Sequence, residues 1–153
     1  MSEIRVKLFC VHLDQCDRKK CTALRLAKFD LVKIRPRLSA CPNGALILDP
    51  FSDDILTEKD NLIAISKGLI VIDCSWAKIE NSFQYSDFIG RRLPNAIAAN
   101  PINYGKTAKL SSAEALAFAL NILGLKNQAH KLLNLFSWGE SFWNINQIDM
   151  NMK

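Results

Sequence analysis

The residues best placed for chemistry are a carboxylate and an indole that follow a strongly apolar segment. Asp73 ends the run at 69–72, and Trp76 comes three residues later. A carboxylate at the end of a buried strand is costly unless it is paired or functional. Asp is also a preferred helix N-cap, so spacing alone explains Asp73 equally well as the cap of the next helix. From spacing alone, the sequence indicates only a ligand-binding α/β protein.

Several familiar catalytic patterns are missing. The six glycines stand at positions 44, 68, 90, 105, 124 and 139. This spacing allows neither a G-x-G-x-x-G loop nor a Walker loop, which argues against Rossmann enzymes and P-loop NTPases. His12 and His130 form no persuasive Ser/His/Asp triad, and we interpret both as structural or surface residues.

The five cysteines, at positions 10, 16, 21, 41 and 74, raise the question of a metal. An odd number without a secretion signal favours reduced thiols over a disulfide framework. The segment that begins Cys41-Pro42 looks like the end of a ferredoxin motif, but no C-x₂-C pair exists for a cluster. By ligand type, a zinc site of His12, Cys16, Cys21 and Cys41 stays open. We expect no metal and interpret these cysteines as partly buried thiols.

The elements that would position Asp73 follow an α/β pattern. The run at 69–72 is continuous, as expected of a central parallel strand covered on both faces, and the carboxyl ends of such strands face the ligand crevice. Ser111 and Glu114 form a capping box before a helix that is apolar nearly all round and therefore buried. We further expect strands at 4–11 and 45–48, helices at 22–29, 57–67, 126–136 and 138–148, and an irregular segment at 91–110.

Composition sets the outer limits. Of the 153 residues, 49% are apolar and 23% charged, which suits one globular domain with at most a small appended lobe. The net charge of +5 is compatible with a polyanionic partner. No apolar run approaches the roughly 20 residues of a membrane span, and no signal peptide is recognisable. We expect a cytoplasmic protein.

Four motifs, in order along the chain, resemble one family. Residues 68–77 (GLIVIDCSWA) are similar to the G-x-x-V-I-D-C-S-W segment of the small-subunit rRNA aminocarboxypropyltransferases. The other three matches are 16–22 (CDRKKCT), the second signature at 91–94, 98–105 and 109–115, and the C-terminal element at 136–139 (FSWG). Arg18 departs from the family, which usually has proline there.

The resemblance implies a fold and a setting. The fold class would be α/β, with a SPOUT-like, knotted domain at 51–153 that contains a parallel sheet. Residues 1–50 would form a small α/β lobe, similar to the leader of RNase L inhibitor ATPases, that contacts RNA. The partner would be small-subunit rRNA or the pre-ribosomal small subunit, and the protein would be a monomer that does not bind membranes.

The resemblance also implies the donor, S-adenosylmethionine, and its site. By analogy, backbone groups of Ile72 and Leu93 hold the ribose and adenine, and Leu48, Ala108 and Leu110 wall the base. Thr22 and Ser112 would hold the amino-acid end, and Trp76 would pack near the sulfonium methyl. Ala108 stands where the family often has an aromatic residue. Candidate contacts to RNA phosphates are Lys19, Lys20, Arg25, Arg91, Arg92 and Lys106.

In the implied reaction, N3 of a uridine-type base attacks the γ-carbon of the donor and releases methylthioadenosine. N3 bears a proton, so Asp73 is the candidate base; its other candidate role is to pair with the donor ammonium. Two alternatives stay open: a SPOUT-type RNA methyltransferase, and a noncatalytic metal-binding factor of ribosome assembly.

The variant Asp73→Asn separates the two roles of this carboxylate, because it keeps the shape and removes the charge. If Asp73 is the base, donor affinity stays near normal, transfer is slow, and higher pH partly restores the rate as N3 ionises unaided. If Asp73 pairs with the ammonium, affinity falls and pH does not rescue it. Calorimetric donor titration and a pH–rate profile are the measurements. Normal binding together with normal turnover would leave Asp73 as a helix cap.

Overall fold

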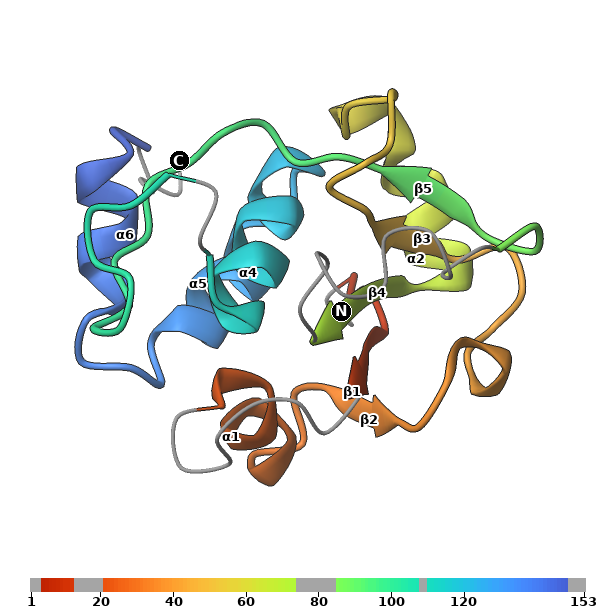
Figure 1. The fold of residues 1–153 in the computed structure, drawn as a ribbon, viewed down its shortest axis with the longest axis horizontal. Coiled ribbons are helices and arrows are strands. Elements are labelled where there is room, and N and C mark those ends of the chain that lie inside the picture. Colours follow the sequence, from red (N-terminus) through yellow and green to blue (C-terminus); the bar gives the residue numbers. More distant parts are fainter. Residues whose placement is uncertain (1–3, 13–20, 74–84, 108–109, 149–153) are drawn as a thin grey trace.

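The computed structural model describes residues 4–12, 21–73, 85–107 and 110–148. Five parallel strands form one sheet in the order β2-β1-β4-β3-β5 (Figure 1). The strands are β1 (Leu8–His12), β2 (Lys33–Arg35), β3 (Leu46–Leu48), β4 (Leu69–Asp73) and β5 (Ile89–Arg91).

Strand β4 is the centre of the sheet, as its unbroken apolar run predicts. It pairs with β1 along its whole length, from Leu8 opposite Leu69 to His12 opposite Asp73. On its other side it pairs with β3. Side chains of a strand alternate between the two faces, so an all-apolar strand needs cover on both. Leu69 and Val71 accordingly belong to one core cluster, and Ile70 and Ile72 to the other.

The direction of each crossover explains which face it covers. The connections β1–β2 and β3–β4 run toward the β2 edge of the sheet, whereas β2–β3 and β4–β5 run toward the β5 edge. Right-handed crossovers of opposite direction lie on opposite faces. Helices α1 (Thr22–Lys28) and α2 (Asn61–Lys67) therefore share the larger cluster. Leu38, Cys41, Tyr85 and Phe88, from the other two connections, pack on the smaller one.

Helix α2 (Asn61–Lys67) ends where the sequence predicts but begins four residues later than the expected start at residue 57. Thr57 and Asp60 form a capping box around a short 3₁₀ turn, η3 (Glu58–Asp60), that leads into the helix. Gly68 ends it with φ +111°, a conformation that side chains rarely adopt. A Cβ there would also crowd the ring of Phe9. The turn thus delivers the chain directly into β4.

Three C-terminal helices cover the face of the larger cluster: α4 (Ser112–Ile122), α5 (Lys126–Leu133) and α6 (Gly139–Ile145). In Figure 1 they stand together to one side of the sheet. Helix α4 is buried over most of its surface, as predicted, and Phe118 meets Phe142 of α6 edge to face. The predicted capping box of Ser111 and Glu114 is present.

Two features of the sheet were not anticipated. The segment 91–110 was expected to be irregular, yet its first residue belongs to the strand β5, which pairs with β3. The sheet also runs without a break across residue 50, because β1 and β3 pair with β4, and β3 also with β5, which follow that residue. No helix of the described residues is long and apolar enough to cross a membrane.

Gly139→Ala should destabilise the protein, because a Cβ at this buried position would overlap the carbonyl of Leu133. Overpacking of this kind costs about 1–3 kcal/mol. The control Ser141→Ala changes an exposed position of the same helix and should stay within about 0.5 kcal/mol. Urea unfolding measures both, and equal midpoints for the two variants would contradict the packing of α6 on the α5 end.

Candidate functional site

The carboxyl ends of the five strands lie along one edge of the sheet, because all strands are parallel. Asp73 ends β4 at this edge, in register with His12. Ile72 and Leu48 precede the same edge on β4 and β3. The side chain of Asp73, and the predicted site residues Trp76, Ala108, Lys19 and Lys20, lie outside the described parts. The described parts therefore supply the frame of the site.

A contact between α1 and α4 brings two predicted donor-binding residues together. Thr22 is the first residue of α1, and its hydroxyl oxygen accepts a hydrogen bond from the Ala113 backbone N–H at 3.0 Å. Ala113 follows Ser112 in the first turn of α4. That turn carries N–H groups without intrahelical partners, which suit a negatively charged group. Thr22 and Ser112 thus meet at one helix start, although 90 residues separate them in the chain.

The carboxylate of Glu114 fixes the loop that precedes α4. The residue is fully buried. One oxygen, Oε2, accepts from the backbone N–H groups of Ala99 (2.6 Å) and Asn100 (3.3 Å). The other, Oε1, accepts from the Asn100 side-chain amide (2.6 Å) and from the Ser111 N–H (2.9 Å) and hydroxyl (3.0 Å). Hydrogen bonds to a charged acceptor are about twice as strong as neutral ones.

The same loop is tied to the last helix. The Asn146 side chain accepts from the Ile97 N–H at 2.7 Å and donates to the Ile97 carbonyl at 2.9 Å. The segment from β5 to this contact runs across the molecule to α6, as Figure 1 shows. The loop 92–107, which holds part of the second family signature, is therefore fixed to α6 at Ile97 and to α4 at Ala99 and Asn100.

The three leucines predicted around the adenine all pack in or on the larger core cluster. Leu48 is buried in the larger core cluster, and Leu93 and Leu110 pack against that cluster. They come from the end of β3, the loop after β5 and the loop before α4. Ile72 faces the opposite side of the sheet. Its predicted role uses backbone groups, so the direction of its side chain does not conflict with that role.

A polar cluster holds the loop after β3 against β5. The Tyr85 hydroxyl donates to Asp49 at 2.6 Å, and the Phe51 N–H donates to the other oxygen of that carboxylate at 2.8 Å. Burial, together with the Asp49 carboxylate, raises the pKa of Tyr85 above its ordinary value. Tyr85 therefore stays a neutral donor and positions the segment beside Leu48.

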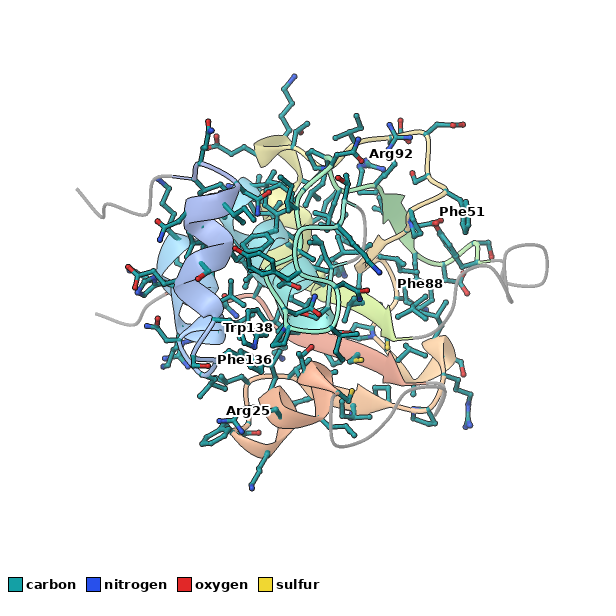
Figure 2. The ribbon with its side chains drawn as sticks, turned by 60° about the vertical axis from the view of Figure 1, so that its left-hand side comes forward. Arg25, Phe51, Phe88, Arg92, Phe136 and Trp138 are labelled. Atoms are coloured by element: carbon teal, nitrogen blue, oxygen red, sulfur yellow. The ribbon has the colours of Figure 1, made fainter. Side chains whose placement is uncertain are left out.

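The predicted RNA-contacting residues differ in their surroundings. Arg91 is only 23% exposed and pairs with Asp60 (3.3 Å) and Asp54 (3.6 Å), so its charge is used inside the protein. Arg92 and Lys106 are exposed. Figure 2 shows Arg92 far from Arg25, which is also exposed and lies over the rings of Phe29 and Phe136.

Of the cysteines in the zinc alternative, the two that the structure describes lie in different core clusters. Cys21 belongs to the larger core cluster and Cys41 to the smaller one, so the sheet separates them. Burial raises the pKa of the Cys41 thiol, although Arg35 partly opposes this. A metal needs the thiolate. Among the described residues, no group of three histidine, cysteine or acidic side chains is placed to hold a metal.

This arrangement defines a ligand-binding α/β protein, with a parallel sheet whose carboxyl edge is framed by anchored loops. Residues 46–152 match the family model "Ribosome biogenesis protein, C-terminal", and residues 6–36 match "Possible Fer4-like domain in RNase L inhibitor, RLI". The 16S rRNA aminocarboxypropyltransferase of Methanosarcina mazei is 42% identical over 93% of this chain and 82% of its own length. That of Vulcanisaeta distributa is 44% identical over 92% and 78%.

A solved structure agrees over the same length. The SAM-dependent rRNA:acp-transferase Tsr3 from Vulcanisaeta distributa superposes with a TM-score of 0.88 at 43% identity, over 93% of this chain and 79% of that one. The chain belongs to the 16S rRNA aminocarboxypropyltransferase family. The resemblance of the four motifs is thereby confirmed, and so is the α/β class with a parallel sheet.

Sequence reasoning missed the residues that hold the site in place. Glu114 was expected only to cap its helix, and Asn100, Asn146 and Tyr85 were given no role as anchors. The available signal was weak: a glutamate in a capping box that is otherwise surrounded by apolar residues. A charge in such a helix needs buried partners.

Glu114→Gln tests the anchor, because it replaces one accepting oxygen by a donor that faces other N–H groups. We expect a loss of about 1–3 kcal/mol in the free energy of unfolding and weaker donor binding as the loop loosens. Glu140→Gln, at an exposed position of α6, is the matched control. Urea unfolding and calorimetric titration give the two quantities. A Glu114→Gln protein as stable as the control would show that the carboxylate is not the anchor.

Proposed function

We propose that this chain transfers the 3-amino-3-carboxypropyl group of S-adenosylmethionine to N3 of a uridine or pseudouridine in small-subunit rRNA. The observation that carries the proposal is the match to a relative described as a SAM-dependent rRNA:acp-transferase, in sequence and in fold, over nearly the whole chain. The activity belongs to ribosome biogenesis, as the description of the matching family model states.

The described residues fit such a donor. An adenine needs an apolar slot, and Leu48, at the carboxyl end of β3, with Leu93 and Leu110 from two loops, would supply apolar side chains for it. The amino-acid end carries a carboxylate and an ammonium group. The hydroxyl of Thr22 and the first turn of α4 at Ser112 offer polar groups of the kind that such an end requires.

The chemistry requires attack at the γ-carbon and not at the more accessible methyl. Trp76 is proposed to cover the methyl and to stabilise the sulfonium by a cation–π contact of about 0.5–2 kcal/mol. This orientation would leave the γ-carbon toward the base. Asp73, at the end of the central strand, would take the N3 proton or hold the donor ammonium. Transfer releases methylthioadenosine.

The remaining assignments extend the same proposal. Arg92 and Lys106, within the loop 92–107, and Arg25, Lys19 and Lys20 would contact rRNA phosphates. Arg91 would not, because two carboxylates pair with it. We also propose a division at residue 50, with a knotted, SPOUT-like second part. The separate spans of the two family models, 6–36 and 46–152, support two parts. We further propose that the protein acts in the cytoplasm as a monomer on the pre-ribosomal small subunit.

The product of the donor tests the function. Purified protein, S-adenosylmethionine and small-subunit rRNA should yield methylthioadenosine in step with the modified nucleoside, both measured by mass spectrometry. S-adenosylhomocysteine instead would make the protein a methyltransferase. In cells, deletion of the gene should remove the aminocarboxypropyl nucleoside from small-subunit rRNA. Persistence of that nucleoside after deletion would overturn the proposal.

A further inference from the structure

A pocket with basic residues in its lining lies at the amino edge of the sheet, opposite the edge of the proposed donor site. A cavity of about 210 Å³ opens where the chain enters β1 and β2 and where α5 passes over them. Strand β1 has five residues at roughly 3.3 Å each, so the two edges lie roughly 15 Å apart. No residue of the proposed donor site lines this cavity.

The cavity has an apolar floor and a basic rim. Leu8, Val32 and Leu132 form buried parts of the lining. Lys7, Lys33 and Lys131 are exposed and line it from the segment before β1, from β2 and from α5, and Arg5 adds a fourth basic group. Asp30 is the single acidic residue in the lining. Arg5 has another interaction in the chain, so the inference rests on the three lysines.

The walls of the cavity are held together. The Gln128 side chain accepts from the Val6 N–H at 2.9 Å and donates to the Val6 carbonyl at 2.8 Å. This pair of bonds fixes α5 on the segment that leads into β1. Lys7 and Lys131 lie on the two segments that this clamp joins, and the three lysines share the lining with one acid, Asp30. Such an arrangement favours an anion between them.

The neighbouring surface favours a nucleotide as the source of that anion. Phe29, immediately before Asp30, is 50% exposed, and the guanidinium of Arg25 lies 5.7 Å from its ring centroid. Arg25 also lies over Phe136, which is stacked at a tilt on Trp138; Figure 2 shows these three on one side of the molecule. Exposed aromatic rings next to cations are the surfaces on which unpaired RNA bases stack.

We propose that this amino-edge pocket binds a backbone phosphate of the substrate RNA, outside the segment that enters the donor site. The inference rests on the proposed function for the identity of the RNA. Lys7, Lys33 and Lys131 supply the charge, and the aromatic surface around Arg25 and Phe29 receives the adjoining unpaired base. The contact positions the RNA and reads no sequence.

The test compares two double variants of the full chain. Lys33→Gln with Lys131→Gln removes two pocket charges, and Lys59→Gln with Lys67→Gln removes two exposed charges elsewhere. Affinity for a small-subunit rRNA fragment is measured across a salt series. The pocket variant should lower the log–log salt slope by about 1 relative to the control. Donor affinity and the unfolding midpoint should be unchanged in both.

Removing the acid of the pocket should have the opposite effect on RNA affinity. Asp30 has φ +60°, a conformation that asparagine tolerates well, so Asp30→Asn removes the acid without strain. This variant should bind the RNA about two- to threefold more tightly. Equal salt slopes for the two double variants, or unchanged RNA affinity in Asp30→Asn, would overturn the proposal that this pocket binds an RNA phosphate. The same results are expected if the pocket binds an acidic protein segment instead. These binding measurements hold whether or not group transfer is observed, so the two proposals can fail separately.

Discussion

The buried carboxylate of Glu114 is the interaction on which the frame of the site depends. Five donors from the loop and the helix start converge on its two oxygens. A buried charge is tolerable only when it is fully hydrogen-bonded, and a loop without regular structure needs partners for its own N–H groups. Each therefore supplies what the other lacks. The first turn of α4 also donates a hydrogen bond to the Thr22 hydroxyl. The anchor therefore links the loop, the buried helix and the start of α1.

The strongly patterned elements could be predicted from the sequence, because their signals are local. The run at 69–72 and the capping box at Ser111 each specify an element through neighbouring residues alone. Strand β5 could not be predicted in this way. It has three residues with a glycine in the middle, and it exists because β3 offers an unpaired edge and Tyr85 occupies the space beside Gly90.

The residues of the site likewise divide into those that the sequence indicates and those that only the fold reveals. The family resemblance indicates Thr22, Ser112 and the three leucines. In the structure, Thr22 contacts the first turn of α4 beside Ser112, and the leucines pack in or on the larger core cluster. The anchors are invisible to motif and spacing because each one joins distant segments: Asn146 reaches Ile97, and Arg91 reaches Asp60. The case of Arg91 is instructive. Its place in a basic motif suggested RNA, but only the fold shows the two carboxylates that neutralise it.

The clamp of Gln128 on Val6 has a consequence for synthesis on the ribosome. Strand β1 is among the first segments to emerge, but its inner neighbour β4 ends at residue 73 and its clamp comes from residue 128. Contacts of such sequence separation form late. Until then, the nascent chain carries an apolar strand with an unpaired side, which is an aggregation hazard. For this chain, the first strand made is among the last to be secured.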